Sequence, residues 1–143
     1  MTNPTLYGVS GSRAIRSIWM AEELAAEIGF EYDHVPTHFV DESKTPEYKA
    51  INPNGRVPAL VDGDVTMFES LAINLYLSKK YDSVLSPRDL REDGLATQWS
   101  IWALTEMEAA MITYVTRHPN IAMFPTVTSR LHGRNPSART STV

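Results

Sequence analysis

The chain has 143 residues, 43% of them hydrophobic, which suffices for one compact domain and part of a second. Its formal net charge of −4 gives no general reason to expect a nucleic acid or an anionic membrane as a partner. The absence of cysteine excludes disulfides, thiolate metal ligands and a cysteine nucleophile of the protein's own, and we expect no metal centre.

The N-terminal region begins with a short β-type run over residues 5–9, and it lacks the long apolar stretch of a signal peptide or membrane anchor. We therefore expect a cytoplasmic protein. Apolar residues at three- and four-residue spacing then predict a helix over residues 13–29. Ser12 suits the N-cap of this helix, and Gly29 suits the C′ position that follows its last turn. A second strand is predicted over residues 30–39.

The middle of the chain alternates short helices and strands. Residues 45–51 predict a helix that Thr45 can cap. Residues 57–61 and 65–68 predict a β-hairpin, because the Asp-Gly pair between them supplies the positive φ angles of a tight turn. A helix over residues 69–82 completes the order βαβαββα.

The rest of the chain predicts one long helix and a tail. A linker over residues 82–88 separates a first domain, residues 1–81, from a helical pattern over residues 89–118. Residues 119–143 are rich in Ser, Thr, Pro and Arg and show no periodicity, so they predict an irregular, poorly ordered tail.

The predicted long helix is apolar over a broad face. One stripe carries Leu95, Trp99 and Trp102, and Glu106 lies on the same stripe. Trp99, Trp102 and Tyr114 either line an aromatic substrate pocket or pack as core against the first domain, and we favour the core.

Pro58 is the unusual residue of the hairpin, because proline has no N–H to donate within a sheet. A cis Val57–Pro58 bond costs only about 0.5–1 kcal/mol relative to trans. It would turn the backbone so that the N–H and C=O of Val57 face outward at a sheet edge, where they can pair with a bound peptide. The alternative is an ordinary edge-strand proline with a trans bond.

These motifs carry a resemblance to a known family. The segment "NPNGRVPALVDGDVTMFESLAINLYLSKKY" resembles the glutathione-binding segment of the glutathione S-transferases, and "LYGVSGSRAIRSIWMAEEL" is similar to their first strand, catalytic loop and first helix. The similarity is to serine-type, bacterial or theta-like members and spans roughly residues 5 to 118. It implies a thioredoxin-like α/β domain over residues 1–81, followed by an all-helical domain that is incomplete in this chain.

The resemblance implies a role for each residue of the glutathione site. Val57 would pair through its main chain with the cysteinyl part of glutathione, and Pro58 would be the cis-proline. Ser70 would take the γ-glutamyl carboxylate, in keeping with the affinity of helix N-termini for anions, and Glu69 would take the amino group. Arg56 could hold the glycyl carboxylate.

His38 is a second, weaker candidate for the glycyl carboxylate. In this family the first helices of the second domain also meet across a two-fold axis, so a homodimer is expected. Glu106 would then either pair across that interface or lie at its rim.

The chemistry implied by the resemblance needs a thiolate. A free thiol with a pKa of about 8.5 is only a few per cent ionised at neutral pH, so a hydroxyl that donates to the sulfur at the start of the first helix would promote ionisation. Ser12 is placed best for this role, but Ser10 and Tyr7 stay open as alternatives. Ser12 could also be a purely structural cap.

Two functions are compatible with this sequence. The first is an enzyme of detoxification that binds glutathione and promotes attack of its thiolate on a small electrophile. The second is a non-catalytic module that binds glutathione or a protein partner on the same scaffold. A disulfide oxidoreductase of the thioredoxin type is excluded, because there is no Cys-x-x-Cys.

Overall fold

The structure is a computed structural model, and it describes residues 3–118 of the chain. The predicted tail lies outside the described residues. The elements, in chain order, are β1 (Thr5–Tyr7), α1 (Ile15–Ile28), β2 (Asp33–Val35), the 3-10 turn η1 (Glu42–Lys44), α2 (Pro46–Ile51), β3 (Ala59–Asp62), β4 (Val65–Phe68), α3 (Ser70–Lys80), α4 (Leu90–Trp102), the π-helical segment η2 (Ala103–Met107) and α5 (Glu108–Arg117).

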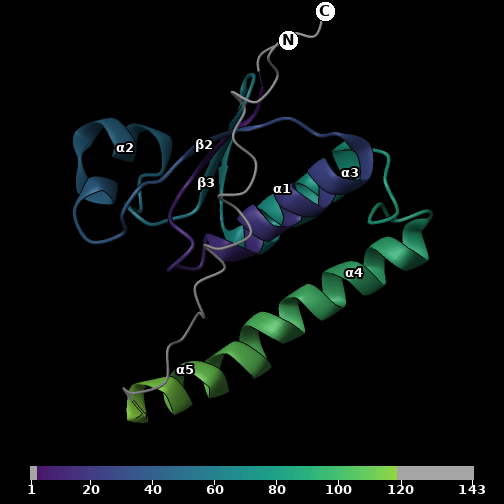
Figure 1. Cartoon of the computed structure of the whole chain (residues 1–143). Coiled ribbons are helices and arrows are strands. Elements are labelled where there is room, and N and C mark those ends of the chain that lie inside the picture. The colour runs from purple at the N-terminus through teal and green to yellow at the C-terminus, as the bar shows by residue number, and fades with distance from the viewer. Residues whose placement is uncertain (1–2, 119–143) are drawn as a thin grey trace, which may run out of the picture.

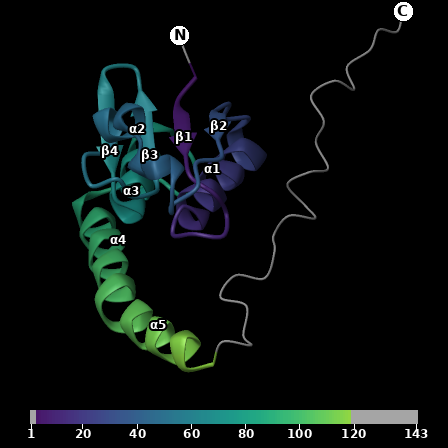
Figure 2. The ribbon, with the colours of Figure 1, turned by 90° about the vertical axis from the view of Figure 1, so that its left-hand side faces the viewer.

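The first part of the chain is a mixed four-stranded sheet in the order β2-β1-β3-β4. Strand β1 is parallel to β2 and antiparallel to β3, with Leu6 opposite Leu60, and β3 and β4 form the predicted hairpin. Helices α1 and α3 lie together on one side of the sheet and α2 lies on the other (Figures 1 and 2). This confirms the predicted thioredoxin-like α/β fold.

The core lies between the sheet and the α1–α3 pair. It forms because the apolar positions of α1 and α3 recur at helical spacing and face the inward residues of β1 and β3. Its most deeply buried large side chains are Leu6, Leu24, Leu60, Ile73 and Leu77. Truncation of such a side chain to alanine typically costs about 2–5 kcal/mol, so this core fixes the positions of the loops that surround it.

The start of α1 differs from the sequence prediction. The helix begins at Ile15 rather than at residue 13, and its N-cap is Ala14, which makes no capping side-chain bond. Ser12 lies two residues before this N-cap, and its hydroxyl accepts from the Ala14 N–H over 3.1 Å. Its role as N-cap was therefore wrong by two residues, since residues 10–14 form turns before the helix. Gly29 does end the helix, with φ 71° as predicted.

The second strand was also predicted too long. Residues 30–39 contain a strand of only three residues, Asp33–Val35, because the chain turns away at Pro36 and Thr37.

Thr45 caps α2 as predicted, by accepting from the Tyr48 N–H over 3.3 Å. Pro58 precedes β3 rather than lying within it, so it interrupts no ladder.

The long helix after the linker crosses beneath the first domain (Figure 1). It is not one continuous α-helix, since η2 separates α4 from α5. The predicted core packing of Trp99, Trp102 and Tyr114 is wrong, because these side chains are 58%, 47% and 54% exposed. No residue of α4 is buried, so within residues 3–118 nothing covers its outer face. None of the helices in this described part is long and apolar enough to cross a membrane.

Candidate glutathione site

The loop from Gly8 to Ala14 brings the end of β1 against the segment that precedes β3. A Cβ on Gly8 would lie 2.5 Å from the Ala14 Cβ and 3.2 Å from the Val57 Cβ, and Gly8 has φ +136°. Glycine is therefore the residue that allows this close approach. His34 holds the loop from β2, since its Nε2 lies 2.7 Å from the Gly8 carbonyl oxygen. The loop is thus fixed beside Val57 and Pro58.

The segment before β3 carries the predicted cis bond, between Val57 and Pro58. The carbonyl of Arg56 accepts from the Tyr48 hydroxyl over 2.8 Å and from Asn52 Nδ2 over 2.6 Å. Burial raises the pKa of Tyr48 to about 12, so this hydroxyl keeps its proton at neutral pH. Among the described residues, neither the N–H nor the C=O of Val57 has a hydrogen-bond partner.

The start of α3 presents Glu69 and Ser70 to the same region. Glu69 has φ 73°, a left-handed conformation that side chains rarely adopt, and its exposed carboxylate pairs with no described cation. Ser70 is 5% exposed and is the first residue of the helix. Its N–H therefore has no partner within α3, and such a group with its aligned dipoles attracts anions.

Two adjoining clefts join these elements to the long helix. One, of about 320 Å³, is lined by Arg56, Val57, Pro58, Glu69 and Ser70 and closed by residues of η2 and α5. The other, of about 440 Å³, extends past Ser12 and is lined by Phe39, Met111 and Ile112 on its apolar side. Arg56 and Val57 line both clefts, so the two form one continuous site.

The other candidates from the sequence lie elsewhere. Neither Ser10 nor Tyr7 lines either cleft, and the Tyr7 ring packs edge-on against Tyr48 with centroids 6.0 Å apart. His38 is also absent from the lining, because its ring stacks on Phe39 and its Nδ1 lies 3.3 Å from Asp41 Oδ1. Thus Ser12, Arg56, Val57, Pro58, Glu69 and Ser70 are brought together, whereas Ser10, Tyr7 and His38 are not.

The Ser12 hydroxyl already has two partners. It donates to the Val9 carbonyl over 2.7 Å and accepts from the Ala14 N–H over 3.1 Å. A hydroxyl has one hydrogen, so donation to a ligand requires that this hydrogen turn away from Val9.

Glu108, the first residue of α5, is a buried carboxylate of the candidate site that the sequence analysis missed. It is 6% exposed and lines both clefts, whereas Glu106 is exposed. Its Oε1 accepts from Arg13 Nε over 2.6 Å and lies 2.9 Å from Arg16 Nη2. Burial by itself raises the pKa of Glu108, but the hydrogen bonds and charges of the two arginines outweigh it, so the pKa lies below the usual range.

A signal for this residue was present in the sequence. Glu108 and Glu106 are the two carboxylates of a largely apolar helical stretch, and the sequence analysis singled out Glu106 because it lies on the stripe of Trp99 and Trp102. Within residues 3–118, no group of three or more acidic or histidine side chains is placed to hold a metal ion.

Sequence comparison identifies the class of protein that has this fold and site. The family model for the N-terminal domain of the glutathione S-transferases matches residues 3–79. The chain therefore belongs to the glutathione S-transferase family.

Two relatives show how similar the sequences are and how much of each chain the similarity covers. A glutathione S-transferase-like protein of Aspergillus terreus is 44% identical over 99 residues, which are 66% of this chain and 42% of the relative. Glutathione S-transferase Z1 of Arabidopsis thaliana is 35% identical over 65% of this chain and 45% of its own length. The chain thus spans about half the length of the curated relatives that it matches.

The solved structures agree with this fold. The theta-class glutathione S-transferase of Xanthomonas axonopodis with glutathione bound has a TM-score of 0.67 and 33% identity, over 78% of this chain and 53% of the other. A glutathione transferase homologue from Sulfitobacter with bound glutathione has a TM-score of 0.66 and 26% identity, over 90% of this chain and 60% of the other.

Proposed function

We propose that this chain binds glutathione in the two joined clefts and promotes attack of its thiolate on a small electrophile. The observation that carries the proposal is the set of unpaired polar groups around the smaller cleft. The N–H and C=O of Val57, the guanidinium of Arg56, the carboxylate of Glu69 and the N–H of Ser70 all lack described partners.

These groups match the chemistry of an extended γ-glutamyl tripeptide. The backbone of Val57 offers an antiparallel pair to the cysteinyl residue. Ser70 offers a helix N-terminus to the γ-glutamyl carboxylate, and Glu69 offers an acceptor to its ammonium. Arg56 offers a cation to the glycyl carboxylate. Bound glutathione in the Xanthomonas and Sulfitobacter homologues supports the same ligand here.

The proposed role of Ser12 is to lower the thiol pKa. A hydroxyl hydrogen that turns from the Val9 carbonyl to the sulfur stabilises the thiolate, and each unit of pKa depression corresponds to about 1.4 kcal/mol. The thiol proton passes to solvent, and the thiolate forms a bond to the electrophilic carbon while the leaving group departs with its electron pair. Phe39, Met111 and Ile112 give the larger cleft an apolar wall that suits an apolar electrophile.

The test separates binding from turnover. Titration calorimetry with glutathione measures binding, and absorbance with 1-chloro-2,4-dinitrobenzene measures conjugation. We expect Ser12→Ala to keep glutathione affinity within about threefold and to lose roughly 10–100-fold in kcat at neutral pH. Ser10→Ala is the matched control and should retain turnover.

Two outcomes would change the assignment. Full turnover in Ser12→Ala would remove the catalytic role from that hydroxyl. Glutathione binding by the parent chain without turnover would support the non-catalytic module. Homodimer formation and a cytoplasmic location stay predictions, which gel filtration and cell fractionation would check.

A further inference from the structure

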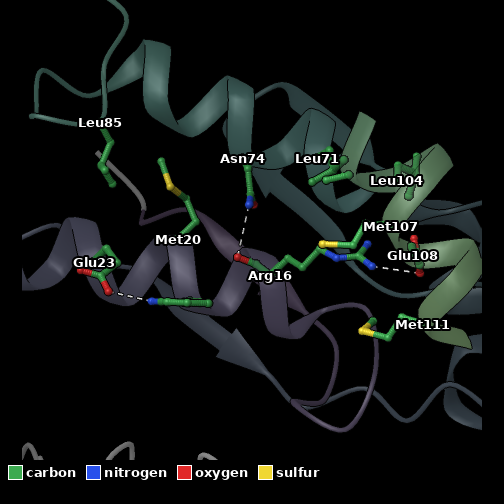
Figure 3. A pocket seen from close by; sticks show the side chains of 12 residues that line it. Arg16, Met20, Glu23, Leu71, Asn74, Leu85, Leu104, Met107, Glu108 and Met111 are labelled. Atoms are coloured by element: carbon green, nitrogen blue, oxygen red, sulfur yellow. Dashed lines mark hydrogen bonds and ion pairs between the residues drawn. The ribbon is translucent and has the colours of Figure 1, made fainter. Parts of the chain in front are cut away.

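A third cleft, of about 430 Å³, lies between the first domain and the long helix (Figure 3). It shares Arg16 and Glu108 with the smaller cleft of the candidate glutathione site and extends from there to the linker. Six apolar side chains from α1, α3, the linker, η2 and α5 line it: Met20, Leu71, Leu85, Leu104, Met107 and Met111. We call this cleft the methionine groove.

The apolar wall of the methionine groove is open to water within residues 3–118. Met107 is 53% exposed, and Leu85 and Leu104 are each more than a third exposed. Trp19, which also lines the groove, is 65% exposed. Contiguous exposed apolar surface marks an interaction site, and methionine side chains adapt to irregular apolar partners. The groove therefore suits an apolar segment of polypeptide.

Two carboxylates mark the end of the groove that lies nearest the linker. Glu23 lines the groove, and Glu27 follows it by one turn of α1. Glu23 accepts from Trp19 Nε1 and Glu27 accepts from the Val84 N–H, each over 2.7 Å. Both side chains are exposed, and neither forms an ion pair within the part of the chain that the structure describes. This end of the groove therefore attracts a cation.

The sequence that follows the described residues has the complementary pattern. Residues 121–124, IAMF, are four successive apolar residues, and the first cation after them is Arg130. Residues 119–143 contain three arginines and no carboxylate, whereas all 17 acidic residues of the chain precede them. The order of an apolar run followed by a cation matches the order of an apolar wall followed by two carboxylates.

The segment is long enough to reach the groove. The described part of the chain ends at His118, and the helix rise of about 1.5 Å per residue places Met111 roughly 10 Å back along α5. An extended chain covers about 3.3 Å per residue, so three or four residues suffice to return that far. Residues 121–124 then lie over the groove wall, and the six residues that follow span at most about 20 Å toward Glu23 and Glu27.

We propose that residues 121–124 of the same chain occupy the methionine groove and that Arg130 pairs with Glu23 or Glu27. The segment turns after α5 and runs back along it toward the linker. Its apolar side chains cover Met107 and Met111, which are otherwise exposed to water. The inference goes beyond the proposed function, because it does not depend on glutathione binding.

The absence of cysteine from the chain allows a direct test by disulfide mapping. Each variant of the full chain carries Ala122→Cys and one cysteine on the long helix, either Met107→Cys or Glu106→Cys. Positions 106 and 107 are both exposed and adjacent in the chain, so the loop-closure entropies to residue 122 are nearly equal. Only residue 107 lines the groove.

The measurement is the rate of disulfide formation in dilute protein with copper-phenanthroline, followed by non-reducing gel electrophoresis. We expect the intrachain disulfide to form at least about fivefold faster for the residue 107 pair than for the residue 106 pair, because docking raises the effective concentration of residue 122 on the groove side.

Further substitutions in the same paired variants identify the contacts. Phe124→Asp would place a charge among apolar side chains, so it should abolish the preference for residue 107, whereas Thr140→Asp, a matched change of charge, should retain it. Arg130→Gln should reduce the preference at least about twofold at low ionic strength, and Arg139→Gln should leave it unchanged.

Each result decides for or against the inference. Equal rates for positions 106 and 107, or a preference that survives Phe124→Asp, would overturn it. Disulfides that join two chains, at a rate that rises with protein concentration, would assign the groove to a second copy and refute occupancy by the same chain. A preference that is lost in Phe124→Asp and kept in Thr140→Asp would support it. Circular dichroism confirms that each variant keeps its fold, since the substituted helix positions are exposed.

Discussion

Replacement of Glu108 by glutamine should destabilise the protein at neutral pH by about 2 kcal/mol. Removal of one partner of a buried ion pair typically costs about 3–5 kcal/mol, because the remaining charge is left without compensation. The Arg13 side chain is 53% exposed and keeps water around its charge, so we expect a loss below this range, of about 2 kcal/mol. For a domain of this size, the expected fall in Tm is roughly 6–10 °C.

The same change should alter the response of stability to acid. The folded-state pKa of Glu108 lies below its usual value, so the unfolded chain binds the proton more tightly than the folded chain. The carboxylate's contribution is therefore complete above the ordinary glutamate pKa of about 4.3 and is lost as pH falls through the folded value. Below that pH the parent carries a neutral carboxyl and resembles the glutamine variant.

Urea unfolding followed by circular dichroism measures this difference at several pH values. The free energies of unfolding of parent and variant should differ by the same amount between about pH 7 and pH 5.5, and the difference should shrink steadily as pH falls below the ordinary glutamate pKa of about 4.3. Glu106→Gln is the control, because its side chain is exposed and has no ion partner among residues 3–118. A gap between parent and Glu108→Gln that does not shrink at all below about pH 4.3 would show that the charge of Glu108 contributes nothing.

Two further substitutions test the loops that frame the site. Gly8→Ala should lower stability by more than about 2 kcal/mol in urea unfolding, because its Cβ would lie 2.5 Å from Ala14 and its φ is +136°. Gly11→Ala has open space around its Cβ and should cost under about 1 kcal/mol; equal losses at both glycines would contradict the close approach. Tyr48→Phe removes the donor to the Arg56 carbonyl and should cost about 1 kcal/mol and weaken glutathione binding, and unchanged calorimetry and melting would count against that role.

The parts of the site that lie within one short segment were predictable from the sequence. Val57 and Pro58 lie twelve positions before Glu69 and Ser70, and the hairpin between them folds both pairs toward one cleft. Local rules suffice here, because turn chemistry fixes the hairpin and helix geometry fixes the N–H of Ser70. The same rules placed Gly29 at the end of α1 and Thr45 at the cap of α2.

Local rules failed where the position of a residue depends on distant contacts. Ser12 was read as a helix cap, but turns before α1 place its hydroxyl between Val9 and Ala14. His38 follows a strand that ends at Val35, so the chain has already turned its ring toward Asp41. Neither displacement follows from periodicity, since both arise in irregular backbone between elements.

In the helical half of the site, the sequence pattern did not indicate Glu108. A stripe read at a constant period of 3.6 residues placed Glu106 beside Trp99 and Trp102. That stripe is the exposed face of the helix, since Trp99 and Trp102 are largely exposed, so Glu106 faces solvent with them. Glu108 lies two residues further on, on the opposite face, where it meets the arginines of α1. This buried carboxylate with two cationic partners attaches the helix to the first domain, whereas no residue of α4 or η2 is buried. Recognition of the site in this protein therefore requires the geometry of a helix that the N-terminal family model does not include.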